Sequence, residues 1–158
     1  MKRPAALALV ALVGCVGAAS SSALLSSEGP LPVNSGQATR LFDQCSRPAP
    51  VPEGLTWQPS RAEVDQLEAS LPSYLNAIHA KGQTTPPVPP QYRGQYVAYT
   101  ERGQPRIYAS FVPADAAAHK GTKKGTAVLV CDGGSRFWGV VYNPATRSFM
   151  DLQFNGPR

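Results

Sequence analysis

The chain is 158 residues long, 42% of them hydrophobic, and carries a formal net charge of +5. This length suits one small domain and excludes two domains of ordinary size. The charge is uneven, with net −2 over residues 16–90 and net +5 over residues 91–158. The basic C-terminal half favours an acidic protein, an anionic glycan or lipid headgroups as partner, whereas its scattered Lys and Arg argue against nucleic acid.

The first residues are typical of a secretory signal. Lys2 and Arg3 precede an apolar run from Ala5 to Val13, and the small residue Gly14 follows. The run is much shorter than the roughly 20 residues that a transmembrane helix needs. An uncleaved anchor is therefore disfavoured, and residues 1–14 are predicted to be a signal peptide that is removed.

The end of this run, Leu12-Val13-Gly14-Cys15, resembles the bacterial lipobox. That resemblance implies that the signal is cut before Cys15 and that Cys15 receives diacylglycerol and acyl chains, which hold a protein stably on a bilayer. Val16 and Gly17 follow, without the Asp that retains enterobacterial lipoproteins at the inner membrane. The resemblance implies a Gram-negative envelope lipoprotein, on the outer membrane rather than the inner, with its domain facing the periplasm. A conventional cut after Ala18 or Ala19 is the alternative, and it would release a soluble protein.

A Ser- and Pro-rich stretch separates Cys15 from the predicted domain. Residues 16–37 have little apolar content and no period, so residues 15–53 are predicted to be a lipidated cysteine and flexible tether. Cys45 and Cys131 remain as one pair once Cys15 carries lipid. Because the periplasm is oxidising, we expect these two cysteines to form a disulfide bond.

Helical periodicity appears first after residue 60. Ser60 and Glu63 form a capping box at the start of a helix, and the cation and glycine of Lys81-Gly82 are typical of a helix C-terminus. Pro72 lies inside the pattern, so we expect helical structure over 60–80 with a kink or break near residue 71. The apolar residues at helical spacing are Val64, Leu67, Leu71, Tyr74, Leu75 and Ile78.

Beyond residue 91 the period becomes two. Five strands are predicted, over residues 92–100, 106–112, 126–131, 136–142 and 147–154, with residues 113–125 as a loop. Their spacing of about ten residues is typical of an antiparallel meander. Residues 54–158 are therefore predicted to be an α+β domain, with the amphipathic helix packed on one face of the sheet.

Catalytic and metal-binding patterns are weak. His79 is expected near the end of the helix and His119 in the loop, and neither has ligand spacing. Asp132 and Asp151 are placed in a turn and a strand, which disfavours a carboxylate pair. We therefore expect no metal or cofactor and no enzyme activity; a small hydrolase using Asp132 or His119 is the alternative.

The hairpin around Trp138 is the candidate protein-binding surface. By alternation Arg136, Trp138 and Tyr142 share one face, and Phe137 and Val141 share the other. If the helix covers the more apolar face, Phe137 meets it and the face with Trp138 stays partly open. Tyr, Trp and Arg are the residues enriched at binding hot spots.

The lipobox and the Cys131-Asp132-Gly133 segment together resemble small periplasmic lipoproteins that inhibit lysozymes, which are compact, β-rich and disulfide-bonded. This resemblance implies a non-enzymatic envelope protein that binds another protein. An inhibitor or immunity protein against a cell-wall hydrolase or toxin is the most concrete version. An accessory structural subunit of an envelope assembly is the alternative.

Overall fold

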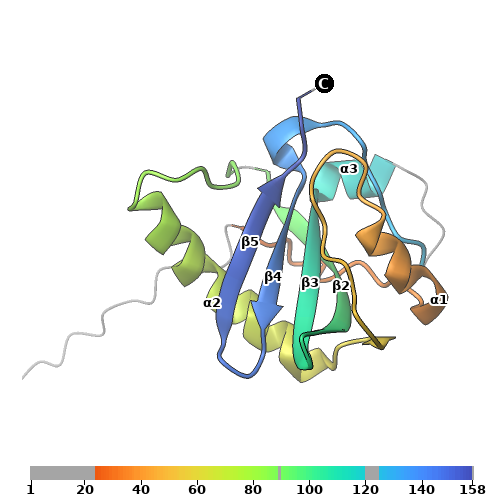
Figure 1. Cartoon of the computed structure of the whole chain (residues 1–158). Helices are drawn as coiled ribbons and strands as arrows, with labels where there is room; N and C mark the ends of the chain where they lie inside the picture. Colours follow the sequence, from red (N-terminus) through yellow and green to blue (C-terminus); the bar gives the residue numbers. More distant parts are fainter. Residues whose placement is uncertain (1–23, 89, 120–124, 158) are drawn as a thin grey trace, which may run out of the picture.

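A computed structural model describes residues 24–88, 90–119 and 125–157. A five-stranded antiparallel sheet lies at its centre, with a long helix on one face and a short helix with extended chain on the other (Figure 1). The predicted signal peptide and Cys15 lie outside the described residues.

The strands follow one another in the sheet in chain order, β1-β2-β3-β4-β5, so the predicted meander is confirmed. β2 and β3 pair over ten residues each, from Tyr92 opposite Pro113 to Glu101 opposite Gln104. Arg102 and Gly103, both at positive φ, make the two-residue turn between them. The strands are β1 (Thr56–Trp57), β2 (Tyr92–Glu101), β3 (Gln104–Pro113), β4 (Trp138–Asn143) and β5 (Ser148–Phe154).

The prediction of a central strand over residues 126–131 is wrong. The fifth strand is instead β1, a two-residue edge strand that pairs with Tyr99 and Ala98 of β2. Residues 126–131 lie on the sheet face opposite the long helix, where Ala127 and Val128 are buried. The apolar run is there because this segment covers a face of the sheet, not because it lies within the sheet.

The long helix is α2 (Arg61–His79), and both hydrogen bonds of the predicted capping box at Ser60 are present. α2 continues through Pro72, so the predicted break is absent, and a kink at this position stays a prediction. Leu71 and Leu75 are buried on either side of the proline, and this packing compensates for the lost backbone hydrogen bond. The shorter helices are α1 (Ser35–Ala38), the 3₁₀ turn η2 (Thr39–Phe42), α3 (Ala114–His119), which lies where a loop was predicted, and the 3₁₀ turn η3 (Gly134–Arg136).

The main core lies between α2 and the sheet. Trp138 of β4 stacks on Phe111 of β3, with ring centroids 4.0 Å apart, and meets the Tyr92 ring edge to face. The helix contributes Val64, Leu67, Leu71, Leu75 and Ile78 to this cluster.

The predicted assignment of the two faces of β4 is therefore reversed. Trp138 and Tyr142 belong to the cluster under α2 and have no exposed surface, whereas Phe137 and Val141 face the other side. The prediction assumed that the helix alone covers the sheet. Both faces are covered, so the larger aromatic side chains take the helix side and neither set lies open.

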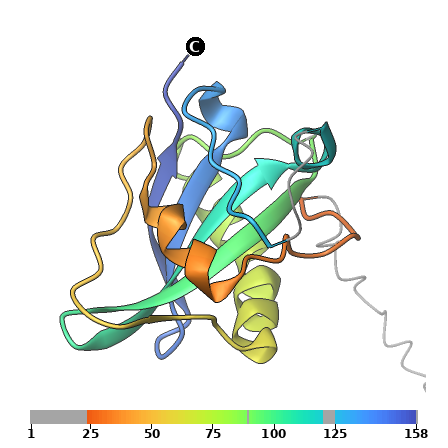
Figure 2. The ribbon, with the colours of Figure 1, turned by 90° about the vertical axis from the view of Figure 1, so that its right-hand side faces the viewer.

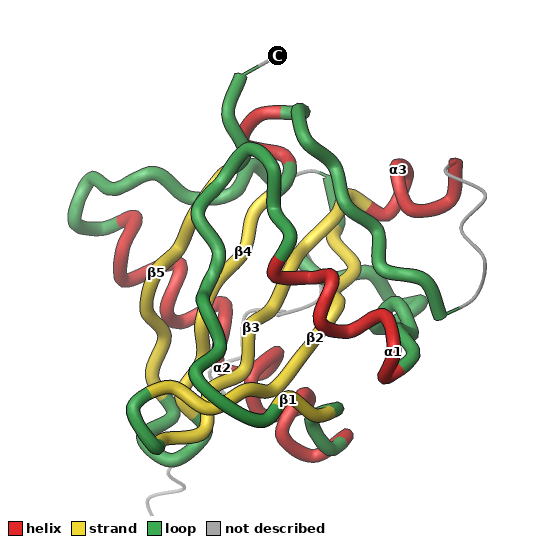
Figure 3. The backbone as a smooth tube through the Cα atoms, turned by 45° about the vertical axis from the view of Figure 1, so that its right-hand side comes forward, coloured by secondary structure: helices red, strands yellow, loops and turns green. Residues whose placement is uncertain are grey.

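The sheet face opposite α2 is covered mainly by the part of the chain that precedes α2. Leu41 is buried, and Ala38, Leu41 and Phe42 pack against Val97, Tyr99, Tyr108 and Val141. In Figure 2 the sheet is seen between α1 and α2, and Figure 3 shows the long loop after α1 crossing the sheet. The prediction that residues 15–53 form a flexible tether is therefore wrong for residues 24–53. Leu41 and Phe42 supply these apolar contacts, and two adjacent apolar residues flanked by polar ones give no periodic signal.

Candidate functional site

Buried polar groups fix the covering chain segments to the sheet face opposite α2. Arg47 is 94% buried, since only 6% of its surface is exposed. Its guanidinium donates to the Tyr108 hydroxyl at 3.1 Å, to Ser110 Oγ at 2.8 Å, and to the side-chain oxygen of Asn155. Gly139 lies beside Tyr108, and a Cβ there would lie 2.6 Å from the hydroxyl. Tyr108 thus reaches Arg47 because Gly139 has no side chain.

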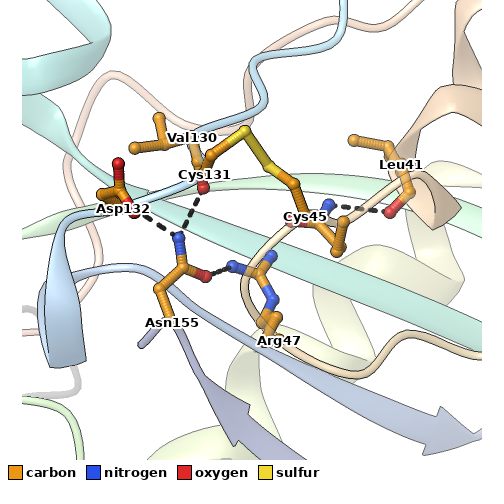
Figure 4. The surroundings of a disulfide bond; sticks show 8 residues. Leu41, Cys45, Arg47, Val130, Cys131, Asp132 and Asn155 are labelled. Atoms are coloured by element: carbon orange, nitrogen blue, oxygen red, sulfur yellow. Dashed lines mark hydrogen bonds between the residues drawn. A yellow bond between two sulfur atoms is a disulfide. The ribbon is translucent and has the colours of Figure 1, made fainter. Parts of the chain in front are cut away.

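The predicted disulfide bond joins Cys45 to Cys131, with Cα atoms 4.9 Å apart. Figure 4 shows this disulfide bond beside Arg47 and Asn155. The side-chain amide nitrogen of Asn155 donates to the Val130 carbonyl at 2.5 Å. The bond therefore joins the segment before α2 to the extended segment before η3, on the same face of the sheet.

Gln95 binds the backbone of that extended segment. Its side-chain nitrogen donates to the Val128 carbonyl at 3.0 Å, and its side-chain oxygen accepts from the Val128 amide at 2.7 Å. Gln95 is fully buried. A side chain thus satisfies the two backbone groups that a neighbouring strand would otherwise have to satisfy.

A pocket of about 210 Å³ opens on this face, beside the Arg47 cluster. One wall is the backbone segment Pro48–Pro50, and Val141 of β4 contributes apolar surface. We call this the Tyr99 pocket. Its polar lining residues are Tyr99, Glu101, Tyr108, Asp151 and Gln153.

A β-bulge directs Asp151 to this pocket. Val141 pairs with Met150 and Gly139 with Gln153, so Val140 stands opposite two residues of β5. Asp151, the first of the two, has φ +53°, which is uncommon for a residue with a side chain. The side chains of Met150 and Asp151 both lie on the face opposite α2, whereas that of Leu152 packs in the core under α2.

Two groups of the pocket have unused hydrogen-bonding capacity within the described part of the chain. The Tyr99 hydroxyl is buried and has no hydrogen-bond partner there. The Asp151 carboxylate, which is exposed, has no hydrogen bond or ion pair with a described residue. Glu101, by contrast, pairs with Arg106 at 3.3 Å.

Burial, followed by the nearby Glu101 carboxylate, raises the pKa of Tyr99 far above its ordinary value. Burial also raises the pKa of Tyr108, and this shift is opposed by the Arg47 guanidinium. Both phenols are therefore neutral at physiological pH and can act as hydrogen-bond donors or acceptors. Such an arrangement can bind a polar group; it holds no nucleophile paired with a base.

The candidate binding residues of the sequence are not brought together at one open surface. Trp138 and Tyr142 are buried under α2, so neither can contact a partner. Arg136 is exposed in η3 and pairs with Asp115 through Nη2, at 2.9 and 3.1 Å from the two carboxylate oxygens. Of the three, only Arg136 lies where a partner could reach it.

The carboxylates considered for catalysis are also separate. Asp151 lines the Tyr99 pocket, whereas Asp132 follows the disulfide-bonded Cys131 and is not among the lining residues. His79 ends α2, as predicted. No group of three or more potential metal ligands occurs within residues 24–88, 90–119 and 125–157.

Sequence reasoning missed the Tyr99 pocket. One signal for it was present: Phe149, Leu152 and Phe154 are spaced by three and then two residues, which breaks the period of a strand. That break indicates a bulge at Asp151. No comparable signal marks Tyr99, whose unpartnered hydroxyl depends on chain from a distant part of the sequence.

Exposed apolar side chains concentrate at one edge of the sheet. Among the described residues, four large hydrophobic side chains are exposed, and Val51, Leu55 and Trp57 are three of them, at 81%, 81% and 38%. The fourth is Val88. Hydrogen bonds from Glu53 to Thr100 and from Thr100 to Leu55 fix this stretch against β2. We call residues 51–57 the edge segment.

No family model, curated protein or solved structure matches this chain. Within the described part of the chain, no helix is long and apolar enough to cross a bilayer.

Proposed function

We propose that the protein is a non-enzymatic, lipid-anchored envelope protein whose domain binds another protein through the edge segment. One observation carries this proposal: three of the four exposed large apolar side chains among the described residues lie within residues 51–57. Clustered apolar exposure costs free energy in water, and in soluble domains it marks surfaces that a partner covers.

The edge segment also offers backbone groups. β1 is the outermost strand of the sheet and is two residues long, and the side of it away from β2 pairs with no strand in the described chain. An exposed strand edge can accept an extended segment of another protein, with exposed side chains giving specificity. The Cys45–Cys131 disulfide supports an oxidising compartment such as the periplasm.

The anchor would hold the domain close to the membrane. Leu24 is buried, and the backbone of Tyr92 bonds with Leu24 and Ser26 at 2.8 Å on either side of residue 25. Cys15 precedes Leu24 by nine residues, whose contour length is at most about 30 Å. A lipid on Cys15 would therefore confine the partner to the neighbourhood of the outer membrane. An inhibitor or immunity protein against a cell-wall hydrolase or toxin is the most concrete such function.

Lipidation is tested by metabolic labelling with a clickable palmitate. We expect the wild-type chain to be labelled and Cys15→Ser to be unlabelled and either unprocessed or released. Cys45→Ala is the matched control, because it changes another cysteine and should retain the label. Strong labelling of Cys15→Ser would contradict the anchor.

Partner binding is tested with a photo-crosslinking amino acid at Leu55, and at Asn76 on the exposed side of α2 as control. We expect one discrete adduct from Leu55 and none from Asn76. The cross-linked protein is then identified, purified and titrated with the full chain, and Leu55→Asp should abolish binding. Equal cross-linking from both positions would contradict the assignment of the edge segment. Turnover of peptidoglycan or ester probes that is lost in Asp132→Ala would instead favour the hydrolase alternative.

A further inference from the structure

The Tyr99 pocket lies on the face of the sheet opposite α2, and its lining chemistry identifies the kind of group that fits it. Its volume, about 210 Å³, is below the roughly 300–1,000 Å³ of sites that enclose drug-sized ligands. It therefore has room for one small group or one side chain. The walls at Ala49, Pro50 and Val141 are apolar, which suits a short alkyl stem.

The free polar groups of the pocket favour a cation. Asp151 contributes a carboxylate with no ion pair within the described chain, and the Tyr99 hydroxyl is fully buried with no partner there. Glu101 adds a second carboxylate, partly neutralised by Arg106. An anion would be repelled by both carboxylates, whereas an ammonium or guanidinium group can donate to Asp151 and to a phenol oxygen.

The two nearby arginines do not occupy the pocket. Arg47 directs all three guanidinium nitrogens to Tyr108, Ser110 and Asn155, and it is not a lining residue. Arg106 bonds with Glu101 and with the Pro105 carbonyl. Both guanidinium groups are thus already bound, to the lining residues Tyr108 and Glu101 among others, and neither pairs with Asp151. The Asp151 carboxylate is left for an incoming group.

We propose that the Tyr99 pocket binds an alkylammonium or guanidinium group, with Asp151 as its counter-ion and the Tyr99 hydroxyl as a hydrogen-bond acceptor. The same chemistry belongs to a free amine and to a Lys or Arg side chain of a bound protein. Val51, exposed and next to the wall residue Pro50, would contact the residues that flank such a side chain.

The test is a titration of the full chain, purified in a non-ionic detergent, with n-butylammonium and with the uncharged isostere 1-butanol. We expect saturable shifts of the backbone amide NMR signals of Tyr99, Asp151 and Gln153 with butylammonium alone. No shift with butylammonium, or equal shifts with 1-butanol, would overturn the proposal.

Variants assign the counter-ion. Asp151→Asn should weaken butylammonium binding about fivefold, the upper range for an exposed charge pair, while Asp132→Asn, outside the pocket, should not change it. Gln153→Glu adds a carboxylate to the lining and should strengthen binding, which keeps the test informative if Asp151→Asn is poorly folded. Unchanged binding in Asp151→Asn and Gln153→Glu would overturn the assignment.

A second arm separates the two sources of the cation. If the natural ligand is a protein side chain, a capped Leu-Lys-Leu peptide should bind more tightly than butylammonium, because the flanking leucines meet Val51. If it is a free amine, butylammonium should bind at least as tightly. Both results support a cation site. The titration involves no partner protein, so its failure would leave the cross-linking test of the edge segment unaffected.

Discussion

The two faces of the sheet are covered in different ways. On one face a single helix packs apolar side chains against aromatic residues of β2, β3 and β4. On the other face, segments from residues 31–50 and 125–131 are joined by a disulfide bond, a buried arginine and two buried amides. The first face gains its stability from apolar burial, whereas the second combines smaller apolar clusters with specific hydrogen bonds and a covalent bond.

The two faces also differ in the character of their pockets. A pocket of about 290 Å³ opens beside α2 and is lined by Tyr74, Ile78, Leu152 and Phe154, so cavities are not confined to one face. In the Tyr99 pocket, the irregular Pro48–Pro50 segment leaves the Tyr99 hydroxyl without a partner in the described chain. The irregular cover thus leaves a buried polar group available to a ligand.

The largest expected effect is on the helix face. Trp138→Ala removes the most central aromatic ring of that core and should lower the free energy of unfolding by about 3–5 kcal/mol. Phe137→Ala, in the smaller cluster of Val112, Ala117 and Val128, should cost less. Urea unfolding of both variants with the disulfide intact measures the difference. A larger loss for Phe137→Ala would reverse the ranking of the two faces.

The next effect concerns the opposite face alone. The disulfide bond joins residues 86 apart, and its removal in Cys45→Ala/Cys131→Ala should cost roughly 2–4 kcal/mol. Hydrogen exchange should then quicken first in residues 45–50 and 125–131 and last in α2. The reduced wild-type chain is the matched control and should behave in the same way. Equal loss of protection in α2 would mean that the two faces unfold as one unit.

The sequence predicts the helix face far better than the other. The spacing of Leu67, Leu71 and Leu75 fixes α2, and alternation with turn residues fixes β2 to β5 within a few residues. The pairing of Cys45 with Cys131 follows from cysteine number once Cys15 is set aside. Gln95 and Val128 show why the opposite face could not be predicted. The Gln95 side chain forms hydrogen bonds with the backbone of a residue 33 positions away, and no local sequence pattern encodes that contact.

A smaller effect tests that contact. Gln95→Leu keeps the size of the side chain but leaves the Val128 amide and carbonyl without their partner, which should cost about 1–3 kcal/mol. Asn76→Leu, on the exposed side of α2, should change stability by less than about 0.5 kcal/mol. Chemical unfolding gives both values, and faster exchange of the Val128 amide locates the loss. A neutral Gln95→Leu would mean that water replaces the amide without cost.

The smallest effect separates folding from binding in the Tyr99 pocket. Asp151 has φ +53°, a conformation that glycine adopts without strain, so Asp151→Gly should relieve the bulge. Glycine also adds entropy to the unfolded chain, and the net gain in stability should be at most about 1 kcal/mol. Butylammonium binding should fall, because the carboxylate is gone. Arg102→Gly, at φ 49° in the β2–β3 turn, is the matched control: it should be equally well tolerated and leave binding unchanged. If Asp151→Gly destabilised the domain, the carboxylate would be holding the fold together and would not be free to serve as a counter-ion for a ligand.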